Sequence, residues 1–175
     1  MRDADIILAI QQKLAVPVGR HLYGVIGTYP ELARFEIALR QARDTNGKPY
    51  PKPNSVTDGI LDGIPDDTFK SEAGLETKRP EVAFALVYNS FKDFLRKTLT
   101  GKGLTVLKDL ELLFAYQVDL SELRVRAADR DLVLLLLPGK READRVRLFP
   151  DQPEGSCTLP TNLIPEDHLW VLEKG

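Results

Sequence analysis

The stretch that decides the fold is HLYGVIGTYPELARFEIALRQA, residues 21–42. Its beginning, together with Arg20, mixes apolar and β-forming side chains, which predicts a short buried strand over residues 20–27. A helix start signal follows directly: Thr28 suits the N-cap, and Glu31, three residues later, completes a capping box. The helix then carries an apolar stripe at helical spacing, made of Leu32, Phe35, Leu39 and Ala42. The stretch therefore predicts a strand, a glycine turn and a helix.

Many proteins hold a phosphate at the helix N-terminus of such an arrangement. A phosphate-binding loop of the pattern G-x-x-x-x-G-K-[ST] also needs a second glycine, a lysine and a hydroxyl. If Gly27 is the first glycine, those three positions hold Leu32, Ala33 and Arg34. In a capping box, Glu31 would moreover turn its carboxylate toward the N–H groups that a phosphate would use. We therefore expect a plain strand–helix corner without a bound cofactor.

A second strand departs from the nucleotide-binding pattern in a similar way. The apolar start of LTVLKDLELLF, residues 104–114, predicts a buried strand. A Walker B strand ends in an aspartate that helps to hold magnesium. Here Lys108 interrupts the apolar run just before Asp109 and Glu111, so these acids fit solvated residues at a strand end. No residue is assigned a catalytic role, and the candidate cofactor-binding residues form a degenerate set: Gly27, Thr28, Glu31, Asp109 and Glu111.

The rest of the chain alternates helical and strand patterns. The run RDLVLLLLPG, residues 130–139, is apolar on both faces, which is typical of a parallel strand in an α/β sheet. Helices are predicted over residues 3–15, 81–99 and 120–128, and further strands over residues 145–149 and 168–173. The expected fold is a single α/β domain, residues 1–175, with three layers, a mainly parallel sheet and flanking helices.

Residues 44–80 interrupt this alternation. They are rich in proline and glycine, and they predict a long, mostly irregular insertion with one short helix near Ser55–Leu61. Long loops within compact domains usually have a function. We expect this segment to contact a partner.

Composition narrows the class of protein. The chain has 175 residues, of which 43% are hydrophobic and 29% charged, which is typical of a globular domain. Its longest apolar run, residues 132–138, is far shorter than the roughly 20 residues of a membrane-spanning helix. The single cysteine, Cys157, excludes an internal disulfide and suits a reducing compartment. Two aspartates precede the first apolar residues, which is untypical of a signal peptide. We expect a cytoplasmic protein without membrane contact.

The second half of the chain also resembles a known family. The segments VLKDLELLF, VDLSELRVRAADRDLVLLLLPGKR and RVRLFP are similar to the C-terminal half of the small P-loop accessory protein of BREX anti-phage systems. The resemblance covers residues 104–150, and residues 20–42 by position only. The matching residues are Leu110, Glu111, Leu113, Phe114, Leu123, Arg130, Pro138 and Gly139.

The resemblance implies an AAA-like P-loop fold that works beside a larger phosphatase-like or ATPase subunit in bacterial defence. It also implies a lysine where this chain has Ala33, and an aspartate where it has Lys108. A member with these degenerate Walker motifs would have lost nucleotide hydrolysis and kept the fold as a surface for protein interaction. We therefore expect a non-catalytic accessory subunit, with a small P-loop NTPase that uses an atypical loop as the alternative.

A metal-dependent nuclease is a third interpretation. Pro65-Asp66 followed by Glu76-Thr77-Lys78 matches the pattern PD-(D/E)xK, in which the acids bind magnesium and the lysine assists the attack. In such enzymes the second half lies on an apolar strand, whereas GLETKRP is polar and flanked by glycine and proline, which favours a chance match. We expect no zinc site, because His21, Cys157 and His168 show no ligand spacing.

Basic residues gather in two parts of the chain. Lys92, Arg96 and Lys97 belong to the predicted helix 81–99. A second group, downstream, interleaves with acidic residues, which favours a solvated, ion-paired face. The alternative is a nucleic-acid contact, although the net charge of −2 gives no global attraction and no aromatic residues are interleaved for stacking. The residues of that contact would be Arg124, Arg126, Lys140, Arg141 and Arg145.

Overall fold

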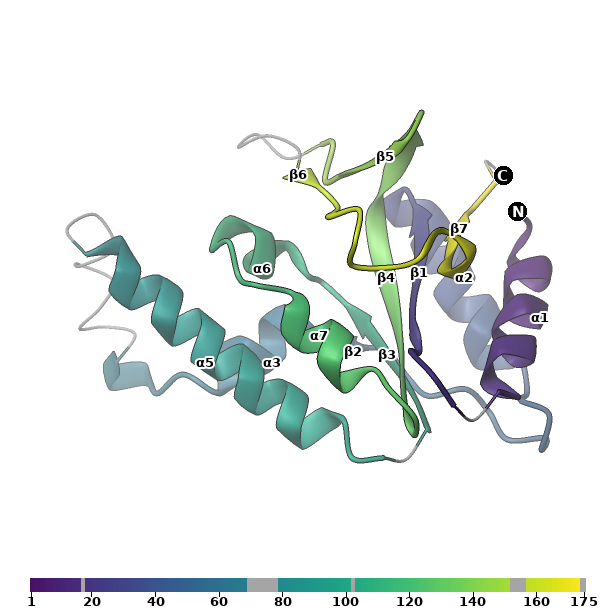
Figure 1. Ribbon diagram of the computed structural model, residues 1–175, viewed down its shortest axis with the longest axis horizontal. Coiled ribbons are helices and arrows are strands. Elements are labelled where there is room, and N and C mark those ends of the chain that lie inside the picture. The colour runs from purple at the N-terminus through teal and green to yellow at the C-terminus, as the bar shows by residue number, and fades with distance from the viewer. Residues whose placement is uncertain (17, 69–78, 102, 152–156, 174–175) are drawn as a thin grey trace.

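A mainly parallel sheet forms the middle of the molecule. Figure 1 shows the computed structural model, which describes all residues except 17, 69–78, 102, 152–156 and 174–175. Five strands lie in the order β2-β3-β4-β1-β7, and each neighbouring pair is parallel. Their bounds are β1 Leu22–Gly27, β2 Asn54–Ser55, β3 Gly103–Lys108, β4 Asp131–Glu142 and β7 Leu169–Val171.

Helices cover both faces of this sheet, which is seen nearly edge-on in Figure 1. On one face lie α1 (Asp3–Leu14) and α2 (Tyr29–Gln41). On the other face lie α3 (Val56–Asp62), α5 (Pro80–Thr98), α6 (Glu111–Ala115) and α7 (Ser121–Arg126). A short 3-10 helix, η1 (Glu166–His168), leads into β7. The predicted three-layer α/β architecture is confirmed, and no helix in the described part of the chain is long and apolar enough to cross a bilayer.

The central strand β4 explains why two helical layers are needed. Val133, Leu135 and Leu137 point into the core beneath α3, α5 and α7, whereas Leu134 and Leu136 point into the core beneath α1 and α2. Residues Leu22–Gly27 of β1 pair with residues 133–138 of β4, residue by residue. The prediction that residues 130–139 form a strand covered on both faces is therefore confirmed, because alternate side chains enter two separate cores.

The predicted start of α2 is also confirmed. The side chain of Thr28 accepts a hydrogen bond from the N–H of Glu31, and the side chain of Glu31 accepts one from the N–H of Thr28. Pro30 lies in the first turn, where its missing N–H has no intrahelical partner to lose.

Residues 44–80 contain parts of the core as well as irregular chain. The predicted short helix is α3, with Ser55 as its N-cap, and its Val56 and Ile60 are fully buried. Strand β2, which the sequence analysis did not predict, pairs with the end of β3. The segment thus contributes the edge strand of the sheet and one of its covering helices.

The far end of β4 leaves the parallel sheet. Residues 139–142 pair in antiparallel fashion with β5 (Arg145–Leu148), and β5 pairs with β6 (Cys157–Thr158). This hairpin rises above the sheet at the top of Figure 1. Strand β4 is therefore longer than the predicted range 130–139, because its second half exchanges its parallel partners for β5.

Core and surface leucines should differ sharply in their contribution to stability. Leu135 is fully buried in β4, so Leu135→Ala should lower the free energy of unfolding by about 3 kcal/mol through lost burial and the cavity it leaves. Leu8 on α1 is 55% exposed, and Leu8→Ala should change it by about 0.5 kcal/mol or less. Urea unfolding of both variants measures the difference, and equal losses would contradict the assigned cores.

Candidate functional site

The carboxyl edge of the parallel sheet is the first place to look for a site, because α/β sheets bind ligands beyond the carboxyl ends of their strands. Gly27 is the last residue of β1, and Thr28 is the N-cap of α2. Asp109 and Glu111 follow the end of β3. The structure therefore brings the candidate cofactor-binding residues to one edge, with β4 between the two strands that carry them.

The N-terminus of α2 is closed at this edge. The N–H of Thr28 donates to Oε2 of Glu31 over 2.8 Å. A Cβ on Gly27 would lie 3.0 Å from Cδ1 of Leu172 and 3.3 Å from Oε2 of Glu31, so the turn is already in close contact on two sides. An N–H that could serve a phosphate is thus taken by a carboxylate, which also adds a negative charge.

A second contact covers the same edge. The hydroxyl of Tyr29, in the first turn of α2, donates to Oε1 of Glu111 on α6 over 2.7 Å. Burial raises the pKa of Tyr29, and the hydrogen bond to Glu111 raises it further, so the phenol stays protonated and remains a donor at neutral pH. Sequence reasoning selected Glu111 but not Tyr29, because the two residues are 82 positions apart and no local pattern indicates their contact.

The position expected for a Walker B aspartate has a different role here. Nζ of Lys108 lies 3.2 Å from Oε2 of Glu36 on α2 and forms an ion pair with it. Asp109 has a positive φ of 55°, and its carbonyl oxygen accepts hydrogen bonds from the N–H and the hydroxyl of Thr57. These residues join β3 to α2 and α3. These contacts stabilise the fold. The three acids at this edge, Glu31, Asp109 and Glu111, would in addition repel a polyphosphate.

The nuclease pattern is only partly described. Asp66 is exposed, whereas Glu76 and Lys78 lie outside the described residues. Among the residues that the structure does describe, no group of three or more His, Cys, Asp or Glu is arranged to hold a metal ion.

A buried polar cluster lies near the start of β1. Nδ1 of His21 is 2.9 Å from the hydroxyl of Tyr23, and the ring of Tyr23 lies 4.6 Å from that of His168. Nδ1 of His168 contacts the carbonyl of Leu22 at 3.2 Å, and Nε2 of His21 is buried without a hydrogen-bond partner among the described residues. The ring of Trp170 stacks on the ring of Tyr23.

Burial sets the protonation of this cluster. It lowers the pKa of both histidines, and their mutual repulsion lowers that of His21 further. Burial raises the pKa of Tyr23 to about 12. Asp167 opposes the shift of His168, but Lys13, which forms an ion pair with Asp167 over 2.8 Å, reinforces it. The histidines therefore favour the neutral form in the folded protein.

The opposite, amino edge of the sheet has a cavity of about 470 Å³. Its walls come from α1, from the segment 44–51 and from the first residues of β3 and β4. The hydroxyl of Tyr50, one of the lining residues, is buried and forms no hydrogen bond within the described part of the chain. Leu14, Leu104 and Leu132 form apolar parts of the wall, and the cavity lies at the opposite edge of the sheet from the site described above.

The basic residues named in the sequence analysis fall into two separate groups. Arg124 and Arg126 lie on α7, whereas Lys140, Arg141 and Arg145 lie on the hairpin of β4 and β5. The two groups are at opposite ends of β4. The five residues therefore do not form one continuous face that could bind a nucleic acid.

Comparison of the chain with protein-family models, with curated proteins and with solved structures found no match.

The histidine cluster should make stability depend on pH. Unfolded histidine has a pKa of about 6.5. Because the folded pKa values of His21 and His168 are lower, the unfolded state binds more protons as the pH falls. The free energy of unfolding should therefore decrease from pH 7 to pH 5, above the range in which most carboxylates titrate.

Urea unfolding at half-unit pH steps measures this dependence. His168→Gln removes one of the two groups, so its stability should change less over the same pH range than that of the parent protein. An equally steep dependence in the variant would show that His168 does not cause it.

Proposed function

We propose that this protein is a non-catalytic, cytoplasmic accessory subunit of a prokaryotic anti-phage assembly, built on a degenerate P-loop-like fold. The observation that carries the proposal is the closed carboxyl edge, where Glu31 accepts the N–H of Thr28 and Glu111 accepts the hydroxyl of Tyr29. A nucleotide would have to break both contacts and would find Ala33 in place of the phosphate-binding lysine.

The strand order supports the P-loop-like part of the proposal. β4 lies between β1, which carries the loop, and β3, which carries the Walker B position, and β7 lies on the other side of β1. Both candidate segments therefore reach the carboxyl edge of one parallel sheet, which is where α/β proteins bind their ligands. The resemblance over residues 104–150 includes β3, α6, α7, β4 and β5, which are consecutive elements of this sheet and its covering layer.

The subunit would act by binding a larger protein, phosphatase-like or ATPase, rather than by chemistry of its own. The segment 44–80 is the proposed contact, together with α5, which packs against α3. Two large apolar side chains are exposed on these helices: Leu61 is 43% exposed and Phe84 is 38% exposed. Apolar side chains of this kind gain most from burial against a partner.

Nucleotide titration tests the loss of phosphate chemistry. Isothermal titration with ATP, ADP and GTP, each with and without Mg²⁺, should give no binding tighter than about 100 μM, which corresponds to about −5.5 kcal/mol. The reason is the missing lysine and the occupied N-terminus of α2. Magnesium-dependent binding below that limit would contradict the proposal and favour the small NTPase.

Co-expression tests the accessory role. The tagged protein should co-purify with the phosphatase-like or the ATPase subunit of a BREX-type system. Leu61→Glu should reduce co-purification at least tenfold, because a charge would enter an apolar contact. The control is Leu8→Glu, which changes a leucine that is 55% exposed on the opposite helical layer, and this variant should retain the complex. If both variants retain the complex, α3 is not part of the interface.

A further inference from the structure

The ion pairs of the hairpin neutralise its basic residues. Lys140 lies 2.8 Å from Glu142, and Arg147 lies 3.8 Å from the same carboxylate. Arg141 pairs with Glu166, and Arg145 with Asp144. The hairpin is therefore the solvated, ion-paired face that interleaved charges predict.

The basic residues at the other end of β4 are arranged differently. The backbone of Arg20 forms an isolated β-bridge with that of Ala128, and the backbone N–H of His21 donates to the carbonyl of Ala127 over 2.8 Å. The segment just before β1 thus pairs in antiparallel fashion with the segment just after α7. This pairing places Arg20 beside the segment that carries three further arginines. We call the four residues the amino-edge arginines: Arg20, Arg124, Arg126 and Arg130.

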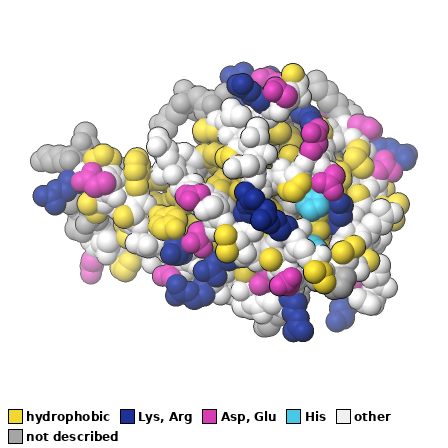
Figure 2. Space-filling model, viewed as in Figure 1, with side chains coloured by type: hydrophobic (Ala, Val, Ile, Leu, Met, Phe, Trp, Pro, Cys, Tyr) yellow, Lys and Arg dark blue, Asp and Glu magenta, His cyan; other side chains and the backbone are white. Residues whose placement is uncertain are grey.

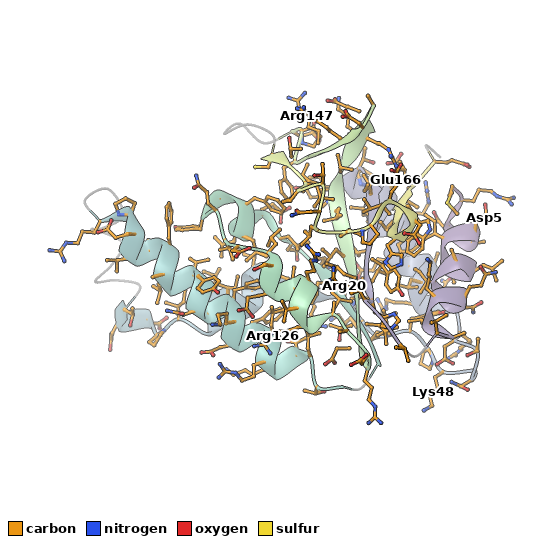
Figure 3. The ribbon with its side chains drawn as sticks, in the orientation of Figure 1. Asp5, Arg20, Lys48, Arg126, Arg147 and Glu166 are labelled. Atoms are coloured by element: carbon orange, nitrogen blue, oxygen red, sulfur yellow. The ribbon has the colours of Figure 1, made fainter. Side chains whose placement is uncertain are left out.

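The figures show the separation of the two basic groups. In Figure 3, Arg126 lies beside α7 and the end of α5, Arg20 lies in the middle of the same view, and Arg147 lies at the top on the hairpin. In Figure 2, several Lys and Arg side chains lie in the lower part of this face, among Asp, Glu, hydrophobic and uncharged groups.

Three of the amino-edge arginines lack an acidic partner. Within the described residues, Arg20, Arg124 and Arg130 form no ion pair. Arg126 shares the carboxylate of Glu122 with Lys92, at 3.3 and 3.8 Å. The last turns of α5 add Arg96 and Lys97 to the same side of the sheet.

Most acids around this edge form an ion pair or accept hydrogen bonds from neighbouring groups. Asp93 pairs with Arg96, and Asp119 accepts the N–H and the hydroxyl of Ser121. Asp131 accepts the N–H of Gly101 over 2.7 Å. Asp129 is exposed between the arginines and is not part of a described ion pair. Hydrogen bonds from neutral donors leave an acid charged, so the excess follows from a count: the seven basic residues named for this edge outnumber its five acids, although the whole chain has a net charge of −2. The basic residues are Arg20, Lys92, Arg96, Lys97, Arg124, Arg126 and Arg130, and the acids are Asp93, Asp119, Glu122, Asp129 and Asp131.

We infer that the amino-edge arginines bind the phosphate backbone of a nucleic-acid duplex, independently of the proposed accessory role. Guanidinium groups match phosphate oxygens through two parallel hydrogen bonds, and unpaired arginines have no internal contact to give up. The aromatic side chain of this region, Tyr88, lies beneath Nζ of Lys92 and near Glu122, so it is not free to stack on unpaired bases. Helix α7 has only six residues, so contacts with the backbone, without reading of base sequence, are expected.

Fluorescence anisotropy with a labelled 20-base-pair DNA duplex tests this inference. Binding should have a dissociation constant on the order of 10⁻⁵ M at 50 mM salt and weaken steeply at 200 mM, because counterions are released from the phosphates. The same sequence as an RNA duplex distinguishes the two sources of backbone phosphate. Similar binding of both duplexes supports recognition of the shared backbone, and a preference for either one identifies the duplex.

Two double variants with the same change in net charge provide the control. Arg20→Gln with Arg124→Gln should weaken duplex binding at least fivefold and reduce the salt slope by about 2, since each phosphate contact contributes about 0.9. Lys140→Gln with Arg145→Gln should change the affinity less than twofold. Neither pair of changes removes a buried contact, and thermal unfolding should confirm that both variants are folded.

Several results would overturn the inference. One is an equal loss in the two double variants, which would indicate a general charge effect. Another is the absence of salt-dependent binding by the parent protein. Tighter binding of single-stranded DNA, or equal competition by polyglutamate, would instead point to stacking or to an acidic protein partner. The co-purification experiment has a different readout, so either proposal can fail while the other stands.

Discussion

The burial of β4 on both faces is the constraint on which the rest of the structure depends. Leu132–Leu137 are six consecutive apolar residues, none more than 9% exposed. Such a strand has no polar face to present to water, so a layer of helices must cover each side of it. Parallel pairing sends the connections from β1 to β2, from β2 to β3 and from β3 to β4 through helices, and it collects the strand ends at two opposite edges of the sheet.

These two edges have different chemistry. At the carboxyl edge, polar side chains bond to one another: Thr28 with Glu31, Tyr29 with Glu111, and Lys108 with Glu36. At the amino edge, by contrast, the backbone of Arg20 pairs with that of Ala128 and Arg124 lies on α7, and neither guanidinium group forms an ion pair with any acid that the structure describes. A nucleotide-binding α/β protein would usually show the reverse, with its available groups beyond the carboxyl ends of the strands.

Much of this fold could be predicted from local sequence, because it is encoded locally. The capping box at Thr28 and the doubly buried run of β4 depend on neighbouring residues and were predicted. Strand β2 was missed because two residues carry no periodicity and become a strand only by pairing with β3. The contact of Tyr29 with Glu111 depends on strand order, which local patterns do not specify. The alternation of His21 and Tyr23 could have indicated a shared face, but His168 arrives from the far end of the chain.

The capping box has a consequence for how this sequence can change. Building a phosphate loop at this position would require replacing Leu32, Ala33 and Arg34 and removing Glu31 from the N-terminus of α2, and none of these changes alone would confer affinity. Losing the cap would meanwhile destabilise α2 by about 1 kcal/mol. Each single substitution toward such a loop that removes the cap would therefore give a less stable protein without a gain in phosphate affinity, so the same hydrogen bonds that begin α2 also hinder this sequence from acquiring nucleotide chemistry.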